Sequence, residues 1–215
     1  NYLRFVLLPA LRRMRFDASI AVSKYGYYPK GMGEVTLTVE PSPKLQPFHI
    51  EEFGTIQKVK GYSVCTFLSD RKVAQRQADA ANAYLSGTGY PASIEVVNDS
   101  SNSLQKGSSI VLWVETDSGV LLGADAIGEL GKMSESVGKE AAENLRVEIL
   151  AKPTVDVHLA DMLIPYMALA EGSSVFLSRT FSDHLQTNIW LAEKMLDVTF
   201  NVEKTNGLFR VEKMG

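Results

Sequence analysis

The spacing of hydrophobic and polar residues predicts a chain in which helices and short strands are mixed. Apolar residues that recur three and four positions apart predict helices over 2–13, from Ser69 to about Leu85, over 136–150, from Val155 and from Asp183. Alternating or β-branched runs predict strands over 16–22, 34–39, 56–68, 94–97, 110–115, 120–124, 174–177, 198–202 and 208–211. Turn signals at 117–119 and at Asn206-Gly207 predict two hairpins. The pattern indicates an α+β fold.

Proline-rich segments divide this pattern into three parts. The cluster Pro41-Ser42-Pro43 with Pro47 marks the first boundary, and Lys152-Pro153 marks the second boundary. Between them, residues 45–152 read as four strands and two helices, which is enough for a self-contained module. We therefore predict an insert domain at 45–152 between two halves of a larger domain, at 1–44 and 153–215.

Composition narrows the class of protein. The chain has 215 residues, 45% of them hydrophobic, which suits an ordinary folded core. Its single cysteine, Cys65, excludes an internal disulfide and favours a reducing compartment. Apolar runs do not reach membrane-spanning length, and a basic-then-apolar leader is missing. We expect a cytoplasmic protein without a membrane partner. The start at Asn1 leaves a fragment or a processed chain open.

Charge is unevenly distributed along the chain. The formal net charge is −3, yet residues 1–30 hold six basic side chains against one acidic side chain, Asp17. A basic segment on an acidic protein fits a site for a polyanion, and an ordinary solvated helix face is the alternative. The basic residues are Arg4, Arg12, Arg13, Arg15, Lys24 and Lys30.

His184 is the first candidate for chemistry. Ser182 or Asp183 can accept hydrogen bonds from the first turn of the helix that follows, and His184, Thr187 and Asn188 then share one polar face. The positive end of the helix dipole favours a bound phosphate and an uncharged imidazole, as histidine attack on phosphorus requires. The alternative is a half-exposed histidine beside a cap. The predicted apolar stripe is Leu185, Ile189, Ala192 and Leu196.

The helix from Val155 carries a second candidate site. Thr154 can cap it, while His158, Asp161 and Met162 fall on one face. Pro165 cannot donate to the carbonyl of Asp161, which could then accept a hydrogen bond from a ribose or a base. The alternative is a proline-kinked core helix, and both can hold because they use different faces.

A third segment, residues 25–34, has the sequence YGYYPKGMGE. Its glycines permit a tight turn, Lys30 could meet phosphate, and its tyrosines could stack on a base. A generic turn between two strands is the simpler reading. Elsewhere, we expect His49 on the surface and Cys65 in the packed interior. Walker, dinucleotide-binding and zinc motifs do not occur.

These three segments together resemble the RNA 3′-terminal phosphate cyclase family. His184, Thr187 and Asn188 match its H-x-x-T-N motif, residues 159–162 match L-A-D-Q except at Met162, and the tyrosine-rich turn matches G-Y-Y-P-K-G-G-G-E except at Met32. The resemblance implies a large domain of repeated sheet-plus-two-helix units, interrupted by a smaller α+β insert domain. It also implies that about a third of such an enzyme lies N-terminal to these residues.

The resemblance implies the following chemistry. His184 takes AMP from ATP, and AMP passes to the 3′-terminal phosphate of an RNA. The neighbouring 2′-hydroxyl then displaces AMP and leaves a 2′,3′-cyclic phosphate. The nucleotide is held by a segment made of His158, Leu159, Ala160, Asp161 and Met162. His158 stands where the family has an aromatic ring that stacks on adenine. Met162 stands where the family has Gln, so one polar contact is lost.

The resemblance also implies partners. They are ATP, RNA 3′ ends, a divalent metal such as Mg²⁺ with unidentified ligands, and the N-terminal part of the same enzyme; a homodimer stays open. Phosphate or RNA contacts are expected from Lys30, Arg4, Thr187 and Asn188. The main alternative is a non-catalytic cyclase-like factor in ribosomal RNA processing. An enolpyruvyl transferase is a further option by analogy of fold alone.

Overall fold

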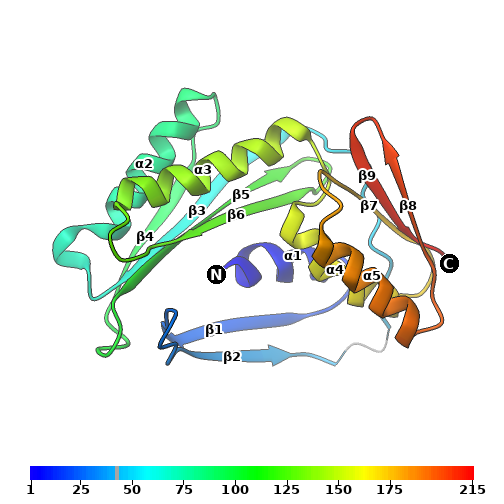
Figure 1. The fold of residues 1–215 in the computed structure, drawn as a ribbon, viewed down its shortest axis with the longest axis horizontal. Helices are drawn as coiled ribbons and strands as arrows, with labels where there is room; N and C mark the ends of the chain where they lie inside the picture. The colour runs from blue at the N-terminus through cyan, green and yellow to red at the C-terminus, as the bar shows by residue number, and fades with distance from the viewer. Residues whose placement is uncertain (42–43) are drawn as a thin grey trace.

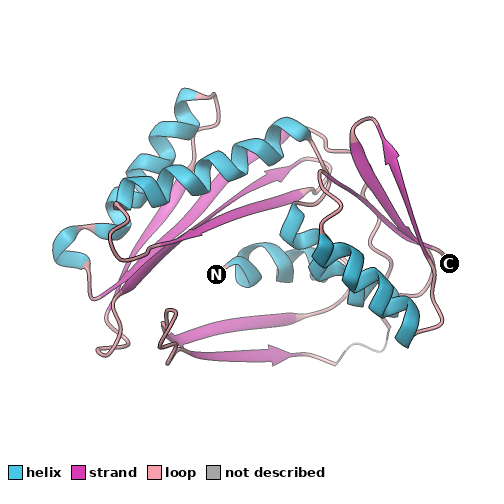
Figure 2. Ribbon diagram, in the orientation of Figure 1, coloured by secondary structure: helices cyan, strands magenta, loops and turns pink. Residues whose placement is uncertain are grey.

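The computed structural model describes residues 1–41 and 44–215 and confirms the predicted α+β class (Figures 1 and 2). Of the predicted boundary cluster, Ser42 and Pro43 lie outside the described residues. The helical elements are η1 (Leu3–Leu7), α1 (Leu8–Arg12), η2 (Ser69–Arg71), α2 (Val73–Gly87), α3 (Ser134–Ala151), α4 (Val157–Leu169) and α5 (Asp183–Met195). The strands are β1 (Ala18–Lys24), β2 (Glu34–Val39), β3 (Ile56–Thr66), β4 (Ser93–Asp99), β5 (Gly107–Thr116), β6 (Leu121–Ile127), β7 (Ser174–Ser178), β8 (Phe200–Thr205) and β9 (Leu208–Lys213).

The middle of the chain forms one sheet with two helices on the same face. Its strand order is β4-β3-β5-β6; β3 and β4 run parallel through the crossover helix α2, and the other neighbours are antiparallel. Helices α2 and α3 lie side by side above this sheet (Figure 1). Gly138 allows the approach, because a Cβ there would lie 2.0 Å from the carbonyl oxygen of Gln77. The expected four strands and two helices are present, while the division into domains stays a prediction.

The N-terminal helical segment covers the opposite face of this sheet. The Phe5 ring stacks on Trp113 of β5 with centroids 4.7 Å apart. At Gly123 of β6, a Cβ would lie 2.6 Å from Val6 and 2.7 Å from Tyr2. The hydrophobic core is therefore continuous between the first helices and the central sheet. Pro9 stands at the start of α1, and the preceding turn is wound as a π-helix.

The last third of the chain is a three-stranded sheet with two helices. Its strand order is β7-β9-β8, and α4 and α5 lie together beside it (Figure 1). Asn206 and Gly207 have φ values of 49° and 84°, which a type I′ turn requires, so the predicted hairpin is confirmed. The described residues include no helix that is both long enough and apolar enough to span a membrane.

Two predicted caps are wrong. Ser69 makes no capping hydrogen bond, because Lys72 takes a left-handed conformation (φ 50°) that separates the turn η2 from α2. Thr154 is used elsewhere: its hydroxyl donates to the carbonyl oxygen of Ile50 and accepts from the amide of Leu177, both at 2.8 Å. The cap of α4 is Asp156.

Asp156 joins three distant parts of the chain. Its buried carboxylate accepts hydrogen bonds from the Tyr2 hydroxyl at 2.6 Å and from the Gly123 amide at 2.8 Å. It also accepts from the first free amides of α4, those of His158 at 3.0 Å and Leu159 at 3.1 Å. Burial raises the pKa of the Asp156 carboxyl, against the opposing effect of these hydrogen bonds. One side chain thus connects η1, β6 and α4.

Replacing this carboxylate should destabilise the whole fold. Asp156→Ala removes the cap and leaves buried donors unsatisfied, so we expect the free energy of unfolding to fall by about 2–4 kcal/mol. Urea denaturation followed by circular dichroism measures this. The matched control is Ser182→Ala, which removes the half-buried cap of α5 with its single hydrogen bond to Leu185 and should cost about 1 kcal/mol. Equal losses for the two variants would contradict the joining role of Asp156.

Candidate active site

Helices α4 and α5 are tied together by one side-chain hydrogen bond. The Asn188 amide nitrogen donates to the carbonyl oxygen of Asp161 at 3.0 Å. This is the carbonyl that lacks a helical partner because Pro165 has no N–H. Asn188 therefore already uses the acceptor that the sequence left open to a ribose or a base, and a contact of the remaining lone pair with a nucleotide stays a prediction. The amide of Asn188, a predicted phosphate or RNA contact, serves to position α5 against α4.

The first turn of α5 presents His184 to solvent. The Ser182 hydroxyl accepts from the Leu185 amide at 3.1 Å, which confirms one of the two predicted caps. His184 and Thr187 are exposed, while the first three members of the predicted stripe face the core. Leu196 is the exception, because it follows the helix as its C-terminal cap and is 36% exposed. The open imidazole that the sequence predicts is present.

Asp161 is within electrostatic reach of both imidazoles. Burial raises the pKa of its carboxyl, and His158 and His184 oppose that shift. Asp161 shares α4 with His158, and the Asn188 hydrogen bond to its carbonyl holds α5, which carries His184, against this part of α4. Met162 follows on the same face and is half-buried against the core. Leu159 and Ala160 are each 1% exposed, so their side chains belong to the core and cannot hold a nucleotide.

His158 borders a cavity that the sequence analysis missed. The cavity has a volume of about 350 Å³ and is lined by His158, Met162, Tyr2 and Asp125, among others. The Tyr2 and His158 rings meet edge to face with centroids 5.9 Å apart. Burial raises the pKa of the Asp125 carboxyl, against the charge of His158. A signal for Asp125 existed, since it is the only charged residue in the apolar strand β6.

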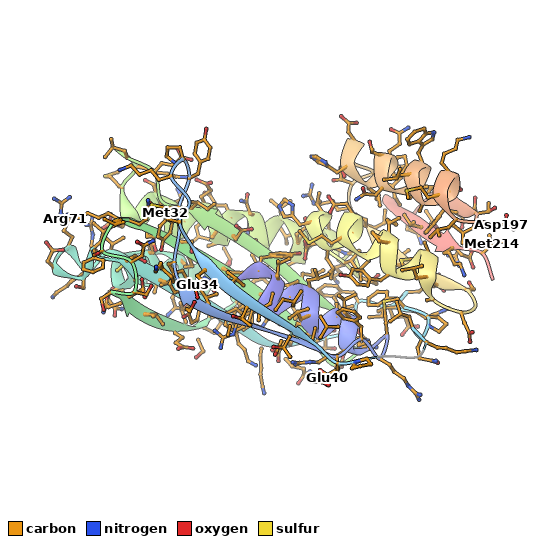
Figure 3. The ribbon with its side chains drawn as sticks, turned by 90° about the horizontal axis from the view of Figure 1, so that it is seen from below. Met32, Glu34, Glu40, Arg71, Asp197 and Met214 are labelled. Atoms are coloured by element: carbon orange, nitrogen blue, oxygen red, sulfur yellow. The ribbon has the colours of Figure 1, made fainter. Side chains whose placement is uncertain are left out.

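The remaining predicted contacts lie apart from α5. The Arg4 guanidinium lies over the rings of Phe5 and Tyr62, 4.9 and 6.0 Å from their centroids. Lys30 is in the turn that connects β1 and β2. Figure 3 shows Met32 of this turn at the end of the molecule opposite Asp197, which follows α5. Among the described residues, no hydrogen bond or ion pair joins Lys30 to α5.

The tyrosine-rich turn is docked on the central sheet. The Tyr25 hydroxyl is 3.0 Å from that of Tyr62, and the Tyr27 hydroxyl is 3.1 Å from the Thr66 hydroxyl. Burial raises the pKa of Tyr27 to about 12. Both tyrosines are half-buried against the central sheet, which fits the simpler reading of this segment as a turn, while Tyr28 is 96% exposed; stacking on a base stays a prediction. Among residues 1–41 and 44–215, no group of three or more His, Cys, Asp or Glu side chains could hold a metal ion.

The link between the two helices can be tested by a double-mutant cycle. Asn188→Ala leaves the Asp161 carbonyl unsatisfied and should lower the free energy of unfolding by about 1–2 kcal/mol. Pro165→Ala supplies a helical N–H for the same carbonyl, so Asn188→Ala should cost less than about 0.5 kcal/mol in that background. Urea denaturation of the four proteins measures the coupling. Gln186→Ala, at an exposed position of α5, is the control; strict additivity of the pair would refute the link.

Comparison with known proteins shows the family of this chain. The family described as RNA 3′-terminal phosphate cyclase matches residues 1–202. An RNA 3′-terminal phosphate cyclase of Pyrobaculum neutrophilum is 40% identical over 215 residues, which cover 100% of this chain and 61% of that protein. One of Methanococcoides burtonii is 42% identical over 211 residues, with 98% and 60% covered. One of Thermococcus onnurineus is 41% identical over 203 residues, with 94% and 58% covered. The chain thus spans about three fifths of the length of these relatives, and it belongs to the RNA 3′-terminal phosphate cyclase family.

Proposed function

We propose that this chain carries the nucleophile of an ATP-dependent RNA 3′-terminal phosphate cyclase. An imidazole nitrogen of His184 attacks the α-phosphorus of ATP; the N–P bond forms, and the bond to the oxygen of pyrophosphate breaks. The terminal 3′-phosphate of the RNA then takes AMP from the imidazole. The neighbouring 2′-hydroxyl attacks that phosphate, AMP leaves, and a 2′,3′-cyclic phosphate results.

The observation that carries this proposal is the placement of His184. It is exposed on the capped first turn of α5, where backbone dipoles favour a bound phosphate. The Asn188 hydrogen bond, one turn further along, holds α5 against α4, so the backbone that carries His184 is positioned before substrate binds. A nucleophile that is open to solvent on a positioned helix is what nucleotidyl transfer needs.

The neighbouring residues suit the remaining roles. Attack through nitrogen places positive charge on the imidazole, and the Asp161 carboxylate nearby can stabilise it. The exposed hydroxyl of Thr187, one turn further along α5, can donate to a phosphate oxygen. His158 can stack on the adenine, more weakly than a tyrosine, and Met162 borders the same cavity. Mg²⁺ stays a prediction: the described residues supply no cluster of ligands for it, and none of these steps is routed through it.

An exposed apolar strand supports the predicted partnership with further sequence of the same enzyme. Val35, Leu37 and Val39 of β2 alternate on one face and are 58%, 57% and 47% exposed. A two-stranded sheet is marginal by itself, and among the strands of residues 1–41 and 44–215 β2 pairs only with β1. We propose that this face packs against sequence that supplies the rest of a family-length polypeptide. The homodimer left open above is an alternative use of the same face.

The predicted cytoplasmic location is supported by a single free, buried cysteine.

The nucleophile is tested by covalent labelling. Incubation with ATP labelled at the α-phosphate should leave acid-labile AMP on the wild-type chain and none on His184→Ala, because that change removes the attacking nitrogen. His49→Ala, which alters another exposed histidine, is the control and should retain the label. Circular dichroism checks the folding of each variant. Labelling that survives His184→Ala would remove the assignment, and a non-catalytic role would follow if a family-length polypeptide that contains the wild-type chain took no label.

Turnover by these 215 residues alone should be low. The cavity beside His158 is open and small for a nucleotide, so much of the ATP pocket is expected from other sequence of a family-length enzyme. We expect the chain to form the cyclic phosphate at least tenfold more slowly than a family-length enzyme that contains it. Chromatography of a 3′-phosphorylated oligonucleotide measures both rates, and equal rates would contradict this expectation.

A further inference from the structure

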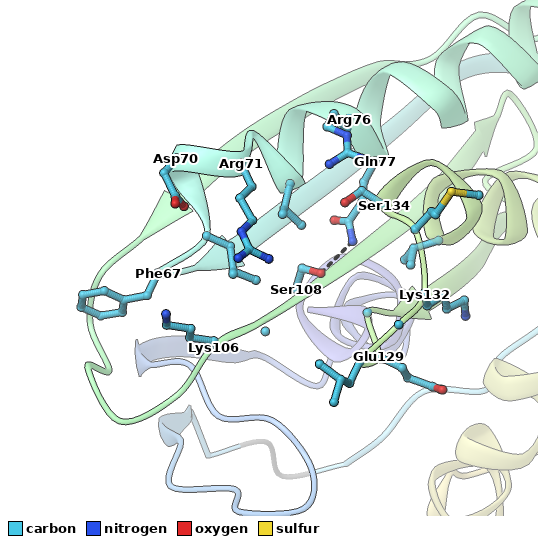
Figure 4. Close-up of a pocket in the computed structure, with 18 residues that line it drawn as sticks. Phe67, Asp70, Arg71, Arg76, Gln77, Lys106, Ser108, Glu129, Lys132 and Ser134 are labelled. Atoms are coloured by element: carbon cyan, nitrogen blue, oxygen red, sulfur yellow. Dashed lines mark hydrogen bonds between the residues drawn. The ribbon is translucent and has the colours of Figure 1, made fainter.

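A second cavity shares no lining residue with the cavity beside His158. It has a volume of about 530 Å³ and lies between the starts of α2, α3 and β5. Arg71, which lines it, and Asp197 beyond α5 are at opposite ends of the molecule in Figure 3. Figure 4 shows its lining side chains. None of the steps proposed above uses this part of the central module.

Two cations in this cavity have no acidic partner. Among the described residues, Arg71 and Lys106 form no ion pair, whereas two other basic lining residues do: Arg76 with Glu135 and Lys132 with Glu140. Figure 4 shows Arg71 reaching toward Ser108, while Glu129 extends away from it. Helices α2 and α3 begin at the cavity without side-chain caps, which adds positive potential. Asp70 and Glu129 also line the cavity, so its formal charges balance; what it offers an anion is two cations, Arg71 and Lys106, that no carboxylate of the described residues neutralises by direct contact.

The floor of the cavity offers a hydroxyl donor. Ser108 is 4% exposed, accepts from the Gln77 amide at 2.8 Å, and donates to no other described residue (Figure 4). Gly128 keeps this hydroxyl accessible, because a Cβ at that position would lie 2.2 Å from the Ser108 oxygen. A buried donor without an acceptor calls for a ligand atom that accepts. A phosphate oxygen between Arg71 and Lys106 would satisfy it.

An aromatic ring stands at the rim of the same cavity. Phe67 is 38% exposed and has a φ of 51°, which is unusual for a bulky residue. The tyrosine-rich turn lies alongside, because the Tyr27 ring contacts Gly107 of the cavity lining. This turn adds the exposed Tyr28 and Lys30 to the surface. Aromatic rings beside cations are the usual means of binding single-stranded nucleic acid.

We propose that this cavity binds a backbone phosphate of single-stranded RNA, with Phe67 stacked on an adjacent base. Arg71 and Lys106 neutralise the phosphate, and Ser108 donates to one of its oxygens. The central module would then bind nucleotides upstream of the 3′ end, while the 3′ end itself reaches His184. The choice of RNA rests on the proposed function, while the affinity for a phosphate rests on the cavity alone.

Fluorescence anisotropy of a labelled ten-nucleotide single-stranded RNA tests this inference. The RNA should end in a 3′-hydroxyl, and ATP is omitted, so that the His184 chemistry does not contribute. We expect Arg71→Ala and Lys106→Ala each to raise Kd about fivefold and to lower the slope of log Kd against log salt by about one. Phe67→Ala should raise Kd by at least about fivefold. The matched control is Lys58→Ala, which removes an exposed charge of the same sheet outside the cavity and should leave Kd within twofold.

Two outcomes would overturn the inference. Wild-type affinity in Arg71→Ala and Lys106→Ala would do so, and so would an equal loss in Lys58→Ala, which would indicate diffuse attraction. Equal affinity for an RNA duplex of the same length would exclude stacking on Phe67. AMP labelling of the same variants separates this inference from the proposed function. Cavity variants that bind RNA weakly but still take the AMP label would uphold both the proposed function and this inference. His184→Ala should bind RNA with wild-type affinity.

Discussion

The buried carboxylate of Asp156 is the interaction on which the arrangement of this protein depends. A carboxylate without partners would be expensive to remove from water, and this one is stabilised by donors from three separate segments. Because Tyr2, Gly123 and the start of α4 all donate to the same group, the N-terminal helix, the central sheet and the C-terminal helices cannot shift independently. The core is continuous across the same junction. His158, two residues further along the chain, is placed by this network.

A second constraint builds the candidate active site from a defect in a helix. Pro165 deprives the Asp161 carbonyl of its normal partner, and the Asn188 side chain replaces the missing donor. A broken backbone hydrogen bond in α4 thereby becomes the attachment point of α5. The result is that Asp161 is within electrostatic reach of two imidazoles from different helices, although the two histidines are 26 positions apart in the sequence. Family motifs that look like separate signals are parts of one contact.

Two sites on the molecule differ in chemistry. One has His184, His158 and Asp161 beside a small open cavity, which suits a reaction at phosphorus. The other has a larger cavity with two cations that form no ion pair among the described residues, a buried hydroxyl and a half-exposed ring, which suits binding without reaction. The tyrosine-rich turn belongs to the second site, because Tyr25 and Tyr27 hydrogen-bond to β3. A polymer substrate that spans both sites would use each for a different task.

The sequence by itself determined the order and type of most elements, because hydrophobic periodicity and turn chemistry act locally; the Asn206-Gly207 hairpin and the helix that begins at Asp183 are examples. It also determined the family, since the three motifs occur in the expected order. Tertiary structure alone decided which polar groups form hydrogen bonds within the protein. Local rules left the Asp161 carbonyl and the tyrosines open to a ligand, and they made Thr154 a candidate helix cap. In the folded chain, the Asp161 carbonyl, the Tyr25 hydroxyl and the Thr154 hydroxyl each hydrogen-bond to a residue that is distant in the sequence. Such competition depends on which segments meet in space, and spacing along the chain does not encode it.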